Sequence, residues 1–211
     1  MTDLTADLLL HAYSIGVFPM ADHKDDPDVY WVDPKKRGIF PIGGFHISRS
    51  LAKTIRQQTF SIDINQNFAA VLDGCADREE TWINPEIRER YIDLHLAGHA
   101  HSLEVYSDGA LSGGVYGVSL GAAFFGESMF SRKTNASKVA LAYLLDRLQQ
   151  TGFQLCDTQF LTPHLASLGA IEISRARYRQ ELAQAITQEA DFTAAEIPAP
   201  QALLQRMTQT S

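Results

Sequence analysis

A stretch of alternating apolar and polar residues between positions 101 and 131 constrains the fold more than any other part of this chain. Its sequence is HSLEVYSDGALSGGVYGVSLGAAFFGESMFS. Asp108-Gly109 stands between two alternating runs, and this dipeptide favours a two-residue hairpin turn because both residues tolerate a positive φ. The stretch therefore predicts a meander of three consecutive antiparallel strands.

Capping signals predict a helix on each side of the meander. Before it, Asn84 suits the N-cap, Pro85 the first turn and Gly98 the C-terminal stop. After it, Asn135 is expected to cap a helix that ends at Gly152. Periodicity and alternation predict further helices at 4–15 (capped by Thr5), 48–58, 66–74 and 175–188, and strands at 59–65 and 153–160.

This order of elements predicts an α+β fold. A small N-terminal domain precedes an N-acyltransferase-like (acetyltransferase-like) domain, whose mainly antiparallel sheet is flanked by helices. The likeness is one of fold and says little about function. A segment rich in Pro, Gly and charge places the domains at 1–34 and 35–190. Residues 191–211, with their Ala, Thr and Pro, are expected to form a partly loose tail.

Composition is typical of a globular protein, with 45% hydrophobic and 20% charged residues and a net charge of −7. The first twenty residues lack the pattern of a signal peptide, and no apolar run approaches the roughly 20 residues that span a bilayer. Cys75 and Cys156 are far apart and in no metal-binding or redox spacing. We therefore expect a reduced, cytoplasmic location without membrane or metal.

Basic residues are concentrated in one segment. Between Lys35 and Arg56 there are six basic residues and no acidic one, a third of the 18 Lys and Arg residues of the chain. Arg49, Lys53 and Arg56 are spaced to share one face of a helix. The segment is either an ordinary solvated face or a surface that contacts the phosphates of a nucleic acid.

Three polar residues interrupt strand faces that are otherwise apolar. Alternation puts Asp157 and Gln159 on an apolar face of residues 153–160, and it puts Glu127 on one face with Met129. Burying such groups without partners costs several kcal/mol. They therefore either bond to one another across the strands or bind a ligand.

Two other patterns suggest chemistry less strongly. GVSLG at 117–121 matches the nucleophile elbow of serine hydrolases, with Asp157 and His164 in the right order, but a strand rather than a helix follows it. His99 and His101 share a strand face without a further metal ligand at a suitable spacing, so structural roles are favoured.

Several long motifs resemble the leucyl/phenylalanyl-tRNA–protein transferase family. They are AYSIGVFPM, WVDPKKRGIFP, HISRSL, TWI, LHLAGHAHSLEV, GGVYGVSLGAAFFGESMFSRKTNASKVAL and LCDTQFLTPHLASLGA, spread over most of the chain between Leu8 and Leu182. The resemblance implies an enzyme that transfers leucine or phenylalanine from its tRNA to the N-terminal Arg or Lys of a protein. The product then carries an N-terminal (N-end rule) degradation signal.

The resemblance also implies roles for individual residues. Asp157 and Gln159 match the proposed catalytic pair, and Glu127 matches a third active-site residue. Trp82, which by its position either packs under a helix start or stacks on a base, matches a tryptophan near the terminal adenosine of the tRNA. The leucyl or phenylalanyl side chain would bind Val115, Phe124, Leu141, Leu144 and Cys156. The acceptor arm of the tRNA would contact Lys35, Lys36, Arg37, Arg49, Lys53 and Arg56, with Arg132, Lys133 and Lys138 as a further site for an anion.

The implied reaction needs no cofactor, because the aminoacyl ester is already activated. The neutral α-amine of the acceptor attacks the ester carbonyl, and a proton is removed as the amide forms. We expect Asp157 to polarise the side chain of Gln159, whose oxygen would accept a hydrogen bond from the amine. Glu127 would either attract the cationic acceptor or position the aminoacyl group. Acetyl-CoA is not expected, since SRKTNASK lacks a glycine-rich pyrophosphate loop. The alternatives are another aminoacyl-tRNA-dependent acyltransferase or a non-enzymatic RNA-binding module.

Two features depart from the family pattern. The glycine-rich segment that usually precedes the first helix has no counterpart here, so we expect a smaller N-terminal domain. Met20 stands where the family often has an aromatic residue, and we expect any contact made by that aromatic ring to be missing.

Overall fold

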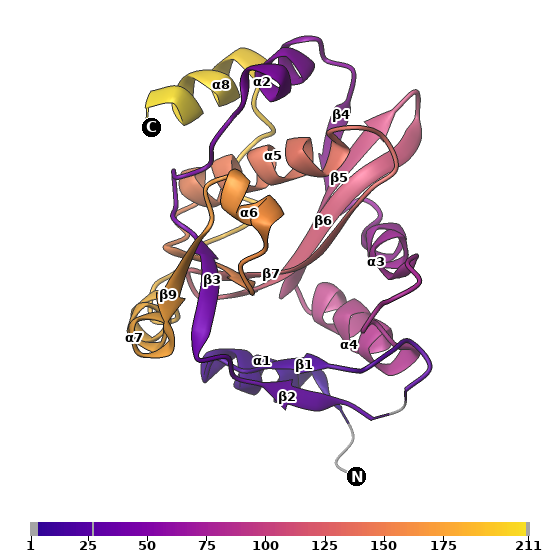
Figure 1. Ribbon diagram of the computed structural model, residues 1–211, viewed down its shortest axis with the longest axis vertical. Helices are drawn as coiled ribbons and strands as arrows, with labels where there is room; N and C mark the ends of the chain where they lie inside the picture. The colour runs from indigo at the N-terminus through magenta and orange to yellow at the C-terminus, as the bar shows by residue number, and fades with distance from the viewer. Residues whose placement is uncertain (1–3, 27, 210–211) are drawn as a thin grey trace.

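A seven-stranded mixed sheet forms the centre of the protein (Figure 1). The computed structural model describes residues 4–26 and 28–209. Neighbouring strands are antiparallel except β7 and β8, which are parallel, so the predicted α+β class with a mainly antiparallel sheet is confirmed. In their order across the sheet the strands are β4 (Ser61–Ile64), β5 (Ala100–Ser107), β6 (Ala110–Leu120), β7 (Ala123–Ser131), β8 (Leu155–Gln159), β3 (Lys36–Phe40) and β9 (Ile171–Ser174).

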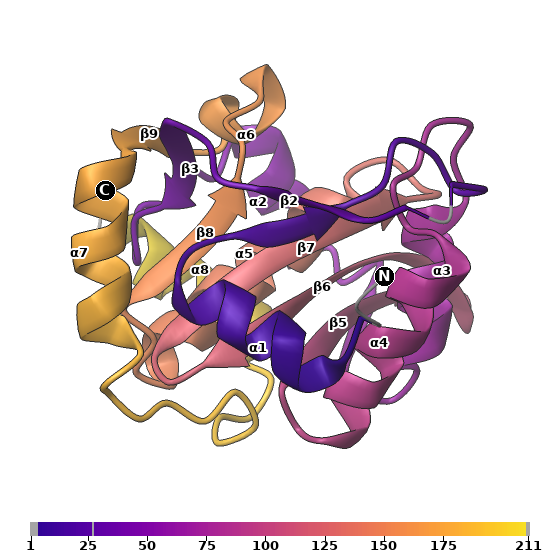
Figure 2. The same cartoon turned by 90° about the horizontal axis from the view of Figure 1, so that it is seen from below.

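Helices cover both faces of the sheet, and each face has its own hydrophobic core (Figure 2). The first core is closed by α1 (Ala6–Ser14), α3 (Phe68–Ala76), α4 (Pro85–Leu96) and α7 (Arg175–Ala185). The second core is closed by α2 (Arg49–Arg56), α5 (Ala136–Gln150), α6 (Pro163–Ser167) and α8 (Pro200–Gln209). A separate two-stranded ribbon is made of β1 (Phe18–Met20) and β2 (Tyr30–Val32).

The predicted meander is confirmed as β5, β6 and β7. Asp108 and Gly109 connect β5 to β6 with φ of 53° and 75°, the backbone of a tight hairpin turn. Thr5 and Asn84 cap α1 and α4 as expected, each accepting a hydrogen bond from the backbone N–H three residues ahead. Each of these signals depends on residues within a few positions of one another, so it fixes the bounds of an element and not its packing.

Two local predictions are wrong, and each has a physical reason. Asn135 does not cap α5 through its side chain, because it adopts a left-handed backbone (φ 70°) and donates its side-chain amide to Thr54 Oγ1 at 3.1 Å. Gly74 does not end α3 but lies within it, where an added Cβ would come within 2.8 Å of the Phe130 ring. The C-terminal tail contains a helix that the sequence does not predict, α8 at Pro200–Gln209, whose Arg206 bonds to the buried Asp146 at 2.7 Å.

None of the helices within residues 4–26 and 28–209 is long and apolar enough to cross a membrane.

Candidate active site

The site lies where the parallel strands β7 and β8 stop pairing. Their register runs from Ala123 opposite Leu155 to Phe125 opposite Asp157. Beyond that point β7 continues along β6, while β8 continues along β3. The separation leaves the ends of two central strands facing a shared space, and both strands carry polar residues there.

A β-bulge aims Glu127 into the first core. Tyr116 pairs with Ser128 and Gly117 pairs with Gly126, so Glu127 is one extra residue on β7. The extra residue shifts the alternation, and Met129 packs on the second core. The prediction that Glu127 and Met129 share a face is therefore wrong, since simple alternation does not include an inserted residue.

Glu127 is buried, at 8% exposure, and is bound by three neutral groups. The hydroxyls of Tyr13 and Tyr91 lie 2.7 Å and 2.9 Å from its two carboxyl oxygens, and Nε2 of Gln159 donates to Oε2 at 2.9 Å. Burial raises the pKa of Glu127 to about 7, although the three hydrogen bonds act in the opposite direction. The residue is thus a carboxyl group that titrates near neutral pH.

Asp157 is fully buried and completely hydrogen-bonded. Arg37 donates from Nε to Oδ1 at 2.9 Å and from Nη2 to Oδ2 at 2.6 Å. The Tyr178 hydroxyl donates to Oδ2 at 2.8 Å, and the backbone N–H of Gln159 donates to Oδ1 at 2.7 Å. Burial beside Asp157 raises the pKa of Tyr178, which keeps its hydroxyl a donor. Four hydrogen bonds thus fix both oxygens of this carboxylate in place.

Arg37 is not part of an exposed basic surface, which corrects the prediction from its charge run. It is 1% exposed and lies between the rings of Phe18 and Tyr178, with Cζ 4.6 Å and 4.4 Å from their centroids. Its Nη1 donates to the backbone oxygen of Gly16 at 2.9 Å. A guanidinium whose donors are used in this way belongs to the interior of the site.

Gln159 connects the two carboxyl groups. Its backbone is held by Asp157 in a left-handed conformation (φ 63°), an uncommon state for a residue with a side chain. Its side chain is held by Glu127. Asp157 therefore bonds to the backbone of Gln159 and not to its side chain, in contrast to the predicted polarisation of that side chain.

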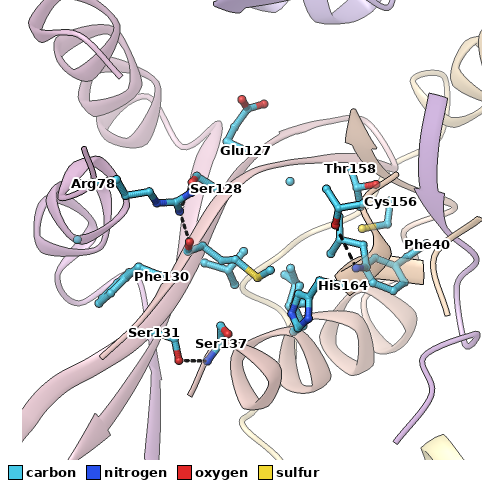
Figure 3. Close-up of a pocket in the computed structure, with 18 of the residues that line it drawn as sticks. Phe40, Arg78, Glu127, Ser128, Phe130, Ser131, Ser137, Cys156, Thr158 and His164 are labelled. Carbon is cyan, nitrogen blue, oxygen red and sulfur yellow. Dashed lines mark hydrogen bonds between the residues drawn. The ribbon is translucent and has the colours of Figure 1, made fainter. Parts of the chain in front are cut away.

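A cavity of about 550 Å³ opens beside these residues. Its apolar wall includes four of the predicted substrate-binding residues, Val115, Leu141, Leu144 and Cys156. Figure 3 shows Phe40, Cys156 and Thr158 on one side and Arg78 and Phe130 on the other. The polar part of the lining includes Glu127, Asp77, Ser128, Arg78, Arg132 and His164.

Two predicted substrate-binding residues lie outside this lining. Phe124 is fully buried in the second core, where its ring packs against Phe153 and Phe192 behind the cavity wall. Trp82 is half-buried ahead of α4, with its ring edge-on to Tyr91 at 6.3 Å between centroids. Phe124 thus belongs to the second core, while Trp82 keeps part of its surface open to solvent.

The remaining basic residues fall into two separate groups. Arg49, Lys53 and Arg56 are exposed on α2, and the bond between Asn135 and Thr54 joins that helix to the loop before α5. This loop region carries the other predicted anion contacts: Arg132 in the cavity lining, Lys133 bonded to Asp108, and Lys138 half-buried. Lys35 and Lys36 are exposed at the start of β3. In Figure 1 this end of β3 points toward β2 and away from α2. Lys36 also forms an ion pair with Glu172 at 2.8 Å.

A second, more polar hollow of about 330 Å³ lies around His101. The ring bonds to Asn65 at 3.0 Å and Ser119 at 3.1 Å and stacks on Phe192. Burial lowers the pKa of His101 to about 4, so it is neutral at physiological pH. Ser119 thus contacts His101 and not His164, and β7 follows it, so the arrangement of a serine hydrolase is absent from the described residues.

Several residues of the site were not identified from the sequence. Tyr13, Tyr91 and Tyr178 occupy helix positions that face the core, and periodicity does not separate a packing tyrosine from one whose hydroxyl binds a carboxylate. Arg78 follows α3 and bonds to Ser128 and to the backbone oxygen of Met129 across the cavity wall. A charged residue with a strand partner fifty positions away leaves no local signal.

Comparison with known proteins gives a consistent result along the whole chain. A family profile described as leucyl/phenylalanyl-tRNA protein transferase matches residues 39–183, and a profile for the N-terminal domain of that family matches residues 2–35. The chain is 67% identical to the leucyl/phenylalanyl-tRNA–protein transferase of Ruegeria sp. (strain TM1040), 65% to that of Ruegeria pomeroyi and 60% to that of Roseobacter denitrificans. In each case the alignment has 208 residues and covers 99% of both chains. Among solved structures, L-PGS from Bacillus licheniformis aligns over 76% of this chain and 54% of that chain, at 13% identity and a TM-score of 0.41.

Proposed function

The chain belongs to the leucyl/phenylalanyl-tRNA protein transferase family, and we propose that its cavity of about 550 Å³ binds the side chain being transferred. Membership makes it an aminoacyltransferase with an aminoacyl-tRNA donor and a protein acceptor. The observation that carries this proposal is the position of the cavity. Its apolar wall of Val115, Leu141, Leu144 and Cys156 leads directly to Glu127, which contacts Gln159. A leucyl or phenylalanyl side chain in the cavity would put its ester next to these polar groups.

The reaction requires positioning more than proton abstraction. The α-amine nitrogen of the acceptor bonds to the ester carbonyl carbon, the bond to the ribose oxygen breaks, and one proton passes from nitrogen to that oxygen. Gln159 donates its Nε2 to Glu127, which leaves its side-chain oxygen to accept a hydrogen bond from the attacking amine. Asp157 supports this geometry through the backbone of Gln159, and it acts as a positioning residue.

The acceptor in this proposal is a protein with N-terminal Arg or Lys, and its cation lies near Glu127. Glu127 is the acidic residue in the lining that reaches the Gln159 side chain. An acidic N-terminus would be repelled once Glu127 is ionised. Transfer of Leu or Phe to such proteins, in the cytoplasm, would create an N-terminal degradation signal.

The tRNA would lie over the mouth of the cavity. Residues of α2, of the neighbouring loop and of the first turn of α5 supply a basic surface there: Arg49, Lys53, Arg56, Arg132, Lys133 and Lys138. Lys35 and Lys36 form a second contact at the start of β3. Trp82 remains our candidate for stacking on the terminal adenosine, and Arg37 is excluded because it is buried.

A transfer assay tests this proposal. Radiolabelled leucine on Leu-tRNA is offered to two versions of one protein, beginning with Arg or with Asp. Label on the Arg version alone supports the cationic acceptor site. Label on the Asp version, or equal label on both, contradicts it.

A further inference from the structure

Three oxygen-bearing side chains from three separate elements form a closed ring inside the site. Tyr13 comes from α1, Tyr91 from α4 and Glu127 from β7. The two hydroxyl oxygens are 2.6 Å apart, and they lie 2.7 Å and 2.9 Å from Oε1 and Oε2 of Glu127. All three contacts are within the range of O–H···O hydrogen bonds.

The number of hydrogen atoms decides which charge state this ring accommodates. Each tyrosine hydroxyl carries one hydrogen, and an ionised carboxylate carries none. With Glu127 ionised, two hydrogens serve three contacts, so one pair of oxygens faces each other without a proton. With Glu127 protonated, three hydrogens serve three contacts.

The protonated arrangement also uses each donor once. At the observed distances, a protonated Oε1 of Glu127 would donate to Tyr13, the Tyr13 hydroxyl would donate to Tyr91, and the Tyr91 hydroxyl would donate to Oε2 of Glu127. Gln159 Nε2 donates to the same Oε2, which has two lone pairs to accept both bonds. No hydroxyl in the ring is left without an acceptor.

We propose that Glu127 of the free enzyme stays protonated up to near-neutral pH, and that Tyr13 and Tyr91 are positioning residues that hold its proton in this ring. The surroundings favour the neutral form. Asp157 and Arg37 form a salt bridge with each other, so their charges largely compensate near Glu127. The other groups that face it are neutral Gln159, Tyr116 on β6 and, farther out, Arg78 after α3. The raised pKa of Glu127, caused mainly by burial, agrees with this state.

The ring makes the charge of the site depend on the acceptor, a step that rests on the function proposed above. A cation near a carboxyl group favours its ionised form. An acceptor with N-terminal Arg or Lys would therefore ionise Glu127 and release its proton to the buffer. A neutral N-terminal side chain would leave Glu127 protonated, so the site would form an ion pair only with the correct acceptor.

The free enzyme provides the primary test. Carbon NMR of protein labelled at the glutamate carboxyl carbon follows each titration, and the Glu127 signal is identified by its loss in Glu127→Gln. We expect its midpoint near neutral pH, well above the value of about 4.3 for an ordinary glutamate. A midpoint near that ordinary value would overturn the proposal.

Variants of the tyrosines distinguish the ring from simple donation to a carboxylate. If the ring holds the proton, Tyr91→Phe and Tyr13→Phe each remove a partner of the neutral form, and the Glu127 midpoint falls. If the tyrosines only donate to an anion, their removal raises the midpoint, and the proposal is wrong. Tyr116→Phe is the matched control, because the Tyr116 hydroxyl is buried near the ring but has no hydrogen-bond partner in the described residues. The titration midpoint of Glu127 in Tyr116→Phe should equal that in the wild type.

Proton release on peptide binding tests the acceptor site independently of the hydrogen-bonded ring. Calorimetry in two buffers of different ionisation enthalpy compares peptides that begin with Arg or Ala and are otherwise identical. We expect additional proton release with the Arg peptide near pH 6.5, and none in Glu127→Gln. If the free enzyme has the raised midpoint but both peptides release equal numbers of protons, the acceptor site has failed and the ring has not.

Discussion

Replacing Arg37 by methionine tests how strongly the interior of the site depends on one ion pair. The substitution removes two hydrogen-bonding nitrogens from Asp157, one bond to Gly16 and the stacking on two aromatic rings. Asp157 is fully buried, so the substitution removes the cation that compensates a carboxylate in the interior. Breaking a buried pair in this way typically costs about 3–5 kcal/mol.

The size of this loss in stability depends on how deeply the ion pair is buried. An exposed ion pair between β3 and β9 is therefore the matched control. Lys36 precedes Arg37 and pairs with Glu172, but the two side chains are 73% and 36% exposed. Lys36→Met should therefore cost no more than about 1 kcal/mol. Urea unfolding of both variants gives the two free energies under the same conditions.

A double variant identifies the cause of the loss. Arg37→Met combined with Asp157→Asn removes the buried charge that the single variant leaves behind. We expect the double variant to be more stable than Arg37→Met alone, with a coupling free energy well above the 0.3–0.5 kcal/mol or so by which independent sites deviate from additivity. A loss in Arg37→Met no larger than that in Lys36→Met, or additive effects in the double variant, would refute the reasoning.

Three further predictions concern the transfer reaction. Gln159→Ala should lower kcat about 10²-fold while the Kd for aminoacyl-tRNA changes little, because positioning of the amine is lost; equal changes in both would contradict that role. Leu144→Phe narrows the cavity and should reduce transfer of phenylalanine more than transfer of leucine in a competition assay, whereas an unchanged ratio would place the side chain elsewhere. Replacing Arg49, Lys53 and Arg56 together by alanine should weaken tRNA binding and lower the slope of log K against log salt by about 2–3, and an unchanged slope would remove α2 from the interface.

Much of the secondary structure could be predicted because its signals are local. The Asp108-Gly109 turn and the Asn84 cap each depend on residues within a few positions of one another. Asn135 shows the limit of that approach. Its side chain has a tertiary partner, Thr54, and its backbone is left-handed, so the capping role passes to Ser131, whose Oγ accepts from the N–H of Ser137.

The candidate site was harder to predict because its contacts are long-range. Arg37 stands in a basic run that predicts a surface position, yet its partner Asp157 is 120 positions away. The sequence shows Glu127 as an acid on an apolar strand, but the bulge that directs it depends on how β7 pairs with β6. Alternation identifies polar residues that are out of place. It does not identify the hydroxyls of Tyr13 and Tyr91 that bind one of them.

The N-terminal segment is part of the candidate active site and not only an attached domain. Tyr13 contributes a hydroxyl to the ring around Glu127, and Gly16 accepts a hydrogen bond from Arg37, which holds Asp157. Gly16 has φ of 84°, and an added Cβ would lie 3.0 Å from the ring of Tyr178, the other donor to Asp157. The end of α1 is therefore shaped to let Arg37 and Tyr178 approach the same carboxylate. The predicted domain boundary lies near residue 34. Hydrogen bonds cross it at both carboxyl groups, from Tyr13 to Glu127 and from Arg37, the partner of Asp157, to Gly16.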